Sequence, residues 1–100
     1  MSYQRHGKIL ERDVEARLVR KVKELGGVAY KFTSPNQRSV PDRLVCIGGM
    51  AIFVELKRPG QVPTSAQMRE HTRLRALGMT VHVLDTYDLV DAFIDELMIG

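Results

Sequence analysis

The chain of 100 residues has one cysteine, Cys46, so no internal disulfide can form. A single cysteine with three histidines does not support a Cys/His zinc site. No apolar run approaches the length of a membrane span, and the polar residues 1–6 lack the apolar stretch of a secretion signal. We therefore expect a globular domain that resides in a cytoplasm and does not associate with a membrane.

Positive charge is missing from the last quarter of the chain. All 15 Lys and Arg residues precede Leu77, whereas acidic residues crowd the segment 85–96. The net charge is +3. Because the positive charges lie in the first three quarters of the chain, this part is suited to bind a polyanion. The length fits one domain over residues 1–100, without repeats, a linker or low-complexity sequence.

The spacing of apolar residues predicts the order helix, three strands, helix, strand, helix. Helices are expected at 9–25, from 64 or 65 to about 77, and at 87–97, and strands at 28–33, 43–47, 51–54 and 80–84. This α/β order, αβββαβ with a further C-terminal helix, predicts a mixed sheet with helices on both sides.

The second and third expected strands form a hairpin around Gly48-Gly49, a pair typical of a two-residue turn. Counting outward from this turn places Asp42 directly opposite Glu55, with Lys57 two residues further on the same side. Two carboxylates about 5 Å apart repel by roughly 3 kcal/mol at an effective dielectric near 20. We therefore expect a cation beside this pair.

These charged residues also have a plain structural interpretation. Asp42 would then be a turn residue, and Glu55 and Lys57 would mark the solvated end of an edge strand. The other face of the hairpin is apolar too, so the sheet is expected to be covered on both sides. Charges at the rim of such a sheet are costly unless they are paired or used.

Two helical residues are candidates to join the site. Glu15 borders the buried stripe of the first helix, although a solvent-exposed or ion-paired role fits it as well. Gln67 fits a capping box with Thr64 and also lies on the same helix face as His71. Helix capping and participation in the site are therefore both open for Gln67, and the two roles are compatible with each other. His71 and His82 are interpreted as packing or surface residues.

Cations near the hairpin are candidate DNA contacts. Arg38 lies in the polar loop at 34–39, Lys31 precedes this loop, and Arg58 directly follows Lys57. Exposed loop cations often have no function, so we assign these three residues to DNA binding only as a hypothesis.

The expected cluster has the charge of a divalent metal site. If Glu15 reaches the hairpin rim, three carboxylates and Lys57 sum to minus two. Hard oxygen ligands suit Mg²⁺ or Mn²⁺. Such an ion activates a bound water and neutralises charge on a reacting phosphate, and Lys57 would assist. The pattern indicates metal-dependent phosphodiester hydrolysis.

The same residues carry a family resemblance. Pro41-Asp42 followed by Glu55-Leu56-Lys57 resembles the signature of the PD-(D/E)XK nuclease superfamily. A larger ordered set is similar to the VRR-NUC family, the virus-type replication-repair nucleases, in its stand-alone phage and bacterial form. The set comprises Glu15, Gly26-Gly27, Tyr30-Lys31-Phe32, Ser34-Pro35, Val40-Pro41-Asp42, Glu55-Leu56-Lys57 and Gln67. It covers about residues 11 to 85, and departs from the family in the loop before Pro41, where glycines are common and this chain has Asn36 and Ser39.

The resemblance implies a restriction-endonuclease-like fold with the metal, Mg²⁺ or Mn²⁺, held by Glu15, Asp42, Glu55 and the backbone carbonyl of Leu56. Lys57 would be the catalytic lysine and Gln67 a supporting residue. It also implies a homodimer that cuts branched DNA such as four-way (Holliday) junctions, in a bacterium or a phage-infected host. Two alternatives are a non-catalytic DNA-binding or assembly module on a nuclease scaffold and a structural protein whose rim charges form ion pairs.

Overall fold

The computed structural model describes residues 8–99. Its elements, in chain order, are α1 (Glu11–Glu24), β1 (Val28–Lys31), β2 (Arg43–Ile47), β3 (Met50–Leu56), α2 (Ser65–Ala76), β4 (Val81–Leu84) and α3 (Tyr87–Ile99). The predicted order is confirmed, although β1 ends at Lys31 and α3 continues to Ile99. None of the helices in residues 8–99 is both long and apolar enough to span a membrane.

The four strands form one mixed sheet in the order β1-β2-β3-β4. β2 pairs antiparallel with both β1 and β3, and β4 returns parallel to β3 after the α2 crossover. Leu44 pairs with Phe53, which is the register expected from the turn. Gly48 and Gly49 have φ values of 54° and 81°, in the left-handed region that glycine adopts readily, so they close the hairpin.

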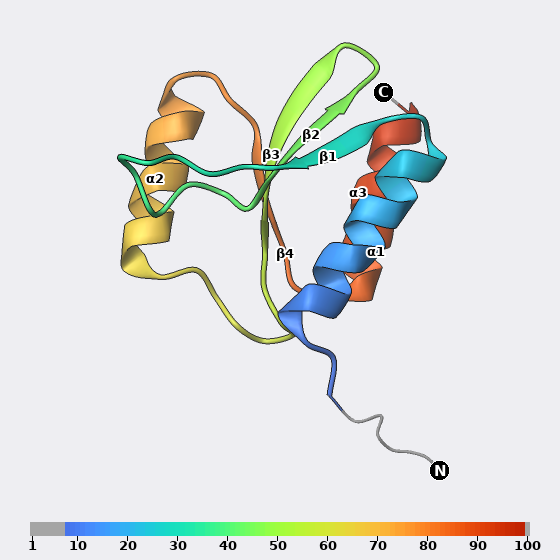
Figure 1. Ribbon diagram of the computed structural model, residues 1–100, viewed down its shortest axis with the longest axis horizontal. Helices are drawn as coiled ribbons and strands as arrows, with labels where there is room; N and C mark the ends of the chain where they lie inside the picture. The colour runs from blue at the N-terminus through green and yellow to red at the C-terminus, as the bar shows by residue number, and fades with distance from the viewer. Residues whose placement is uncertain (1–7, 100) are drawn as a thin grey trace.

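The apolar core lies between the sheet and the helix pair α1 and α3, which lie side by side on one face (Figure 1). Val14, Leu18 and Val22 form the buried stripe of α1, because their i, i+4, i+8 spacing keeps them on one side of the helix. Val90 and Phe93 are among the buried residues of α3. Among the described residues, α2 contributes no member to this apolar cluster.

A charged clamp joins the two core helices at their outer edge. Arg17 of α1 donates from Nε and Nη2 to the two carboxylate oxygens of Asp91 in α3, each at 2.9 Å. Lys21 Nζ adds an ion pair with Asp91 at 3.0 Å, and the Arg17 guanidinium lies 4.7 Å from the centre of the Tyr87 ring. The hydrogen bond from Arg17, followed by that from Lys21, lowers the pKa of Asp91.

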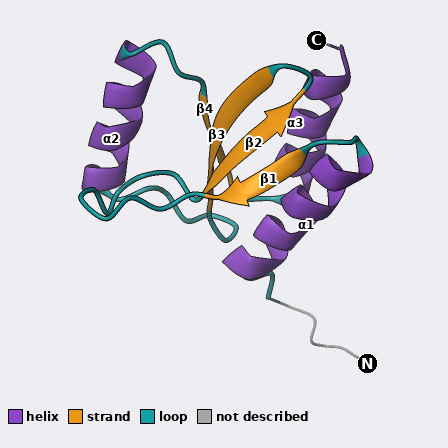
Figure 2. Ribbon diagram, turned by 45° about the horizontal axis from the view of Figure 1, so that its top comes forward, coloured by secondary structure: helices purple, strands orange, loops and turns teal. Residues whose placement is uncertain are grey.

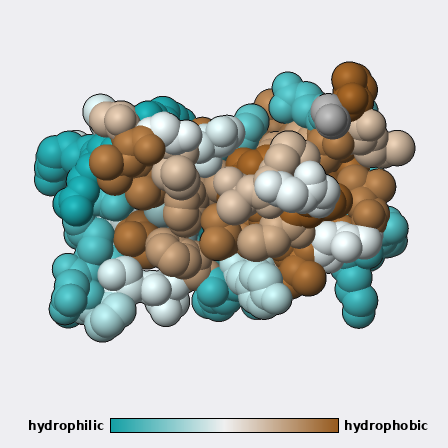
Figure 3. All heavy atoms as spheres, turned by 90° about the horizontal axis from the view of Figure 1, so that it is seen from above, coloured by the Kyte–Doolittle hydropathy of each residue, from teal (hydrophilic) through white to brown (hydrophobic). Residues whose placement is uncertain are grey.

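The second face of the sheet is covered by α2 only in part, which corrects the expectation of cover on both sides. Figure 2 shows α2 set apart from β1 and from the hairpin tip. On this face Val28 and Tyr30 are 46% and 58% exposed, and Ala51 is exposed as well. Seen from the hairpin end, hydrophobic side chains gather across the middle of the molecule (Figure 3). The cover is incomplete because α2 buries polar residues, Glu70 and His71, instead of an apolar stripe.

Candidate active site

Asp42 and Glu55 meet where the hairpin strands leave the core. Asp42 immediately precedes β2, and the backbone N–H of Phe32 donates to its carbonyl oxygen at 2.9 Å. The backbone N–H of Leu56 donates to Asp42 Oδ2 at 2.8 Å, so the Asp42 side chain points toward β3. Glu55 is only 1% exposed. The sheet register thus brings the half-buried Asp42 and the buried Glu55 together, as the turn position predicted.

The electrostatics of this pair are unfavourable for two free carboxylates. Burial above all, then the negative charge of Asp42 and a hydrogen bond between the two carboxyl groups, raise the pKa of Glu55 to about 8. Lys57 opposes this shift, while Glu11 adds to it. Near neutral pH the pair therefore retains a proton. This proton removes one of the two negative charges, whose repulsion led us to expect a cation beside the pair.

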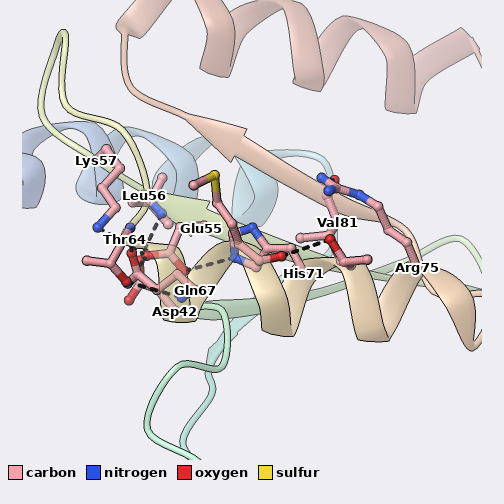
Figure 4. A network of polar contacts seen from close by, with 11 residues as sticks. Asp42, Glu55, Leu56, Lys57, Thr64, Gln67, His71, Arg75 and Val81 are labelled. Carbon is pink, nitrogen blue, oxygen red and sulfur yellow. Dashed lines mark hydrogen bonds and ion pairs between the residues drawn. The ribbon is translucent and has the colours of Figure 1, made fainter.

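Lys57 and Gln67 approach one oxygen of Glu55 from different elements. Lys57 follows β3, is 7% exposed, and places Nζ 3.8 Å from Glu55 Oε2. Gln67 Nε2 donates to the same oxygen at 3.1 Å (Figure 4). The backbone N–H of Gln67 also donates to Thr64 Oγ1, and Gln67 Oε1 accepts from the Thr64 N–H. Both interpretations of Gln67, as a helix cap and as a site residue, describe its position.

The first helix presents two carboxylates, one turn apart. Glu15 Oε2 accepts from Arg43 Nε at 2.7 Å, and Arg43 also donates to the Ala29 carbonyl. The structure therefore places the predicted ligand Glu15 in an ion pair with β2. Glu11 is the α1 carboxylate that interacts electrostatically with Asp42 and Lys57. Burial is the largest cause that raises the pKa of Glu11, the charge of Asp42 raises it too, and the charge of Lys57 lowers it. The sequence reasoning missed Glu11, although its i, i+4 spacing to Glu15 was available.

His71 is a second residue that the sequence reasoning did not assign to the site. It is 2% exposed, and its Nε2 lies 3.5 Å from Glu55 Oε1. Its position four residues after Gln67 was the available signal. His82, by contrast, packs edge-on against Phe93 with ring centres 4.9 Å apart, in agreement with its interpretation as a packing residue.

The donors fit a hard divalent cation, but they are not gathered into a complete site. Within residues 8–99, no group of three or more His, Cys, Asp and Glu side chains converges closely enough to hold a metal ion. Asp42 and Glu55 nevertheless provide two adjacent carboxyl groups at the point where β3 ends, and the Leu56 carbonyl follows them along the chain. Oxygen donors of this kind match Mg²⁺ or Mn²⁺, which retain several water ligands.

Comparison with known proteins agrees with this geometry. No family model matches the chain. The protein "Putative nuclease p44" of Acyrthosiphon pisum secondary endosymbiont phage 1 is 56% identical over 82 residues, which cover 81% of this chain and 88% of the phage protein. A solved structure described as "VRR_NUC domain" matches with a TM-score of 0.80 and 32% identity, over 85% of this chain and 94% of that one. The chain belongs to the VRR-NUC family.

This membership confirms the resemblance drawn from the sequence and the α/β fold expected from it. VRR-NUC domains are part of the PD-(D/E)XK nucleases, which generally use divalent metals. Asp42, Glu55 and Lys57 hold the positions of the motif described from the sequence, and their catalytic role stays a prediction.

Two of the three candidate DNA contacts of the VRR-NUC domain lie beside Asp42. Lys31 and Arg38 line a cavity of about 320 Å³ that Asp42 also borders. Gln37 in the same loop donates to Glu70 Oε1 at 3.1 Å, which fastens the loop to α2. Arg58 lines a different cavity of about 390 Å³, together with the segment before α1. Lys31 and Arg38 therefore share a cavity with Asp42, whereas Arg58 lines a cavity that contains neither Asp42 nor Glu55.

Proposed function

We propose that the chain is a divalent-metal-dependent endonuclease that hydrolyses phosphodiester bonds in DNA. The observation that carries this proposal is the pairing of Asp42 with the buried Glu55 at the end of β3, with the Lys57 ammonium 3.8 Å from Glu55 Oε2. A purely structural rim would gain more from one acid paired with one base, because burying two facing carboxyl groups costs free energy.

The residues of the pair have distinct tasks in this proposal. Asp42, Glu55 and the Leu56 carbonyl would hold Mg²⁺ or Mn²⁺, and the bound ion would supply an activated water and neutralise charge on the phosphate. Glu55 would hold the ion as a carboxylate, with its proton released to solvent. Lys57 Nζ is close enough to Glu55 to reach a phosphate oxygen at the same point, where its charge stabilises the transition state. Gln67 holds the Glu55 carboxylate from α2.

A third carboxylate from α1 would complete the ligand set. The family resemblance implies Glu15, which would have to leave its ion pair with Arg43 in order to bind the metal. Glu11 already interacts electrostatically with Asp42 and Lys57. We therefore propose Glu11 as the residue that first approaches the metal, with Glu15 one turn behind it.

Branched DNA, such as a four-way junction, is the proposed substrate, bound by a homodimer. Lys31 and Arg38 share a cavity with Asp42, and Arg58 lines a second cavity. In this proposal the two groups of cations bind phosphates on either side of the cut. The open sheet face at Val28 and Tyr30 gives a second copy an apolar surface to cover. A two-fold dimer would present two equivalent sites, which suits paired cuts in a junction.

The test uses the wild type, Asp42→Asn and the matched surface variant Asp95→Asn on a panel of branched and linear DNAs. We expect Mn²⁺- or Mg²⁺-dependent cleavage by the wild type and Asp95→Asn, and none by Asp42→Asn, which removes a proposed ligand charge while keeping its shape. Circular dichroism controls for folding. Binding of the panel by the wild type without cleavage in either metal would contradict the proposal and favour a non-catalytic DNA-binding module.

A further inference from the structure

The two oxygens of the Glu55 carboxyl group have different surroundings. Oε2 accepts from Gln67 Nε2 at 3.1 Å and lies 3.8 Å from Lys57 Nζ. Oε1 faces His71 Nε2 at 3.5 Å (Figure 4). Both Oε1 and Nε2 are fully buried, and neither has a hydrogen-bond partner among the described residues. Each of these atoms therefore has only the other to compensate for its loss of water.

The helix that carries His71 is fixed to the sheet on both sides of it. Gln67 lies one turn before His71 and contacts Glu55, whereas Arg75 lies one turn after it and donates to the Val81 carbonyl of β4 at 2.8 Å. The spacing i, i+4, i+8 aligns these three side chains along the inner side of α2. The contacts of Gln67 and Arg75 thus hold His71 opposite Glu55 without involving either of the His71 ring nitrogens.

The imidazole is suited to donate a hydrogen bond without carrying a charge. Burial lowers the pKa of His71, and the positive charge of Arg75 lowers it further. A neutral ring has one N–H, which at Nε2 would point at Glu55 Oε1. A small tightening from 3.5 Å would bring these two atoms to the usual length of a hydrogen bond.

We propose that His71 is a positioning residue for Glu55, whose Nε2–H holds Oε1 while Gln67 holds Oε2, so that the carboxylate plane is fixed for metal binding. The inference rests on the proposed function, because it assigns Glu55 to the metal. Partners that orient ligand carboxylates and imidazoles in this way typically contribute 10- to 100-fold to metal affinity.

The experiment compares His71→Leu, His71→Gln and the control His82→Leu with the wild type. Mn²⁺ affinity is measured by titration calorimetry on the metal-free protein, together with the Mn²⁺ concentration for half-maximal cleavage and the thermal midpoint. We expect His71→Leu to weaken Mn²⁺ binding by about 10- to 100-fold, with cleavage recovering at high Mn²⁺. The Gln amide reaches a position near Nε2, so His71→Gln should stay within a few-fold of the wild type, as should His82→Leu.

Other results separate the two levels of the proposal. If His71→Leu lowers the thermal midpoint but the folded variant binds Mn²⁺ as tightly as the wild type, His71 is only a packing residue and the inference is overturned. If His71→Leu does not fold, His71→Asn serves instead; its shorter amide should also weaken Mn²⁺ binding, and unchanged affinity would overturn the inference. A wild type that binds no Mn²⁺ would overturn the proposed function and this inference with it.

Discussion

Glu55 is the residue at which the demands of folding and of function conflict. It is buried against a second carboxyl group, and its pKa is raised from 4.5 to about 8. The folded protein therefore binds this proton more tightly than the unfolded chain does. The resulting stabilisation is fully present below about pH 4.5 and is lost as the pH rises through 8, at about 1.4 kcal/mol per pH unit within this window.

We predict that the metal-free wild type loses stability between pH 6.5 and 8, and that Glu55→Gln does not. The buried His71 acts in the opposite direction, because its lowered pKa costs stability as the pH falls below 6.5, so the higher window isolates Glu55. Urea denaturation across this range measures the difference. Saturating Mn²⁺ should also flatten the wild-type curve, and an equal slope in Glu55→Gln would contradict this account.

Neutral variants of Glu11 and Glu15, the two α1 carboxylates, should differ in their effects on cleavage and on stability. Glu11→Gln is expected to reduce metal-dependent cleavage strongly and to leave stability nearly unchanged, because Glu11 interacts with Asp42 and Lys57 at the site. Glu15→Gln should lower the free energy of unfolding by about 1–2 kcal/mol, since it weakens the charged bond from Arg43. Cleavage assays and urea denaturation of both variants test this. Loss of cleavage only in Glu15→Gln would restore Glu15 as the α1 ligand.

Among the elements, the junction between α1 and β1 allows no side chain at Gly27. A Cβ atom there would lie 2.8 Å from Ile47 Cβ and 2.9 Å from the Cys46 carbonyl oxygen, at the end of β2. We predict that Gly27→Ala lowers the free energy of unfolding by about 1–3 kcal/mol, because backbone must move to make room. Gly26→Ala is the comparison, because its Cβ would meet open space and its cost comes from a φ of 90° alone. Wild-type stability in Gly27→Ala, measured with urea, would show that β2 yields easily.

The elements and the hairpin register were predictable because they follow from local signals. Gly48-Gly49 fixed the turn, and the turn fixed the opposition of Asp42 and Glu55. The partners of single side chains were not predictable in this way. The Glu15–Arg43 ion pair joins residues 28 positions apart, and the burial of His71 depends on a helix that packs through polar groups instead of an apolar stripe. Tertiary contacts of this kind leave no periodic pattern in the sequence.

For the whole molecule, the uncovered part of the sheet predicts self-association. Tyr30 is 58% exposed on the face that α2 leaves open, beside the exposed Val28. We expect Tyr30→Glu to shift the protein from dimer to monomer, because a charge in an apolar contact is costly to bury. Sedimentation equilibrium measures the mass, with Met98→Glu on the exposed end of α3 as the control. A wild type that is monomeric at high micromolar concentration would rule out this dimer.

The most direct measurement is cleavage of a labelled four-way junction beside a linear duplex of matched sequence, with Mg²⁺, Mn²⁺ or a chelator. Wild type and Lys57→Ala are compared, because Lys57 lies beside the carboxyl pair and is proposed to stabilise the reacting phosphate. The account predicts paired cuts near the branch point of the junction, lost with the chelator and in Lys57→Ala. Cleavage that survives the loss of Lys57, or a junction that is bound but left whole in both metals, would contradict it.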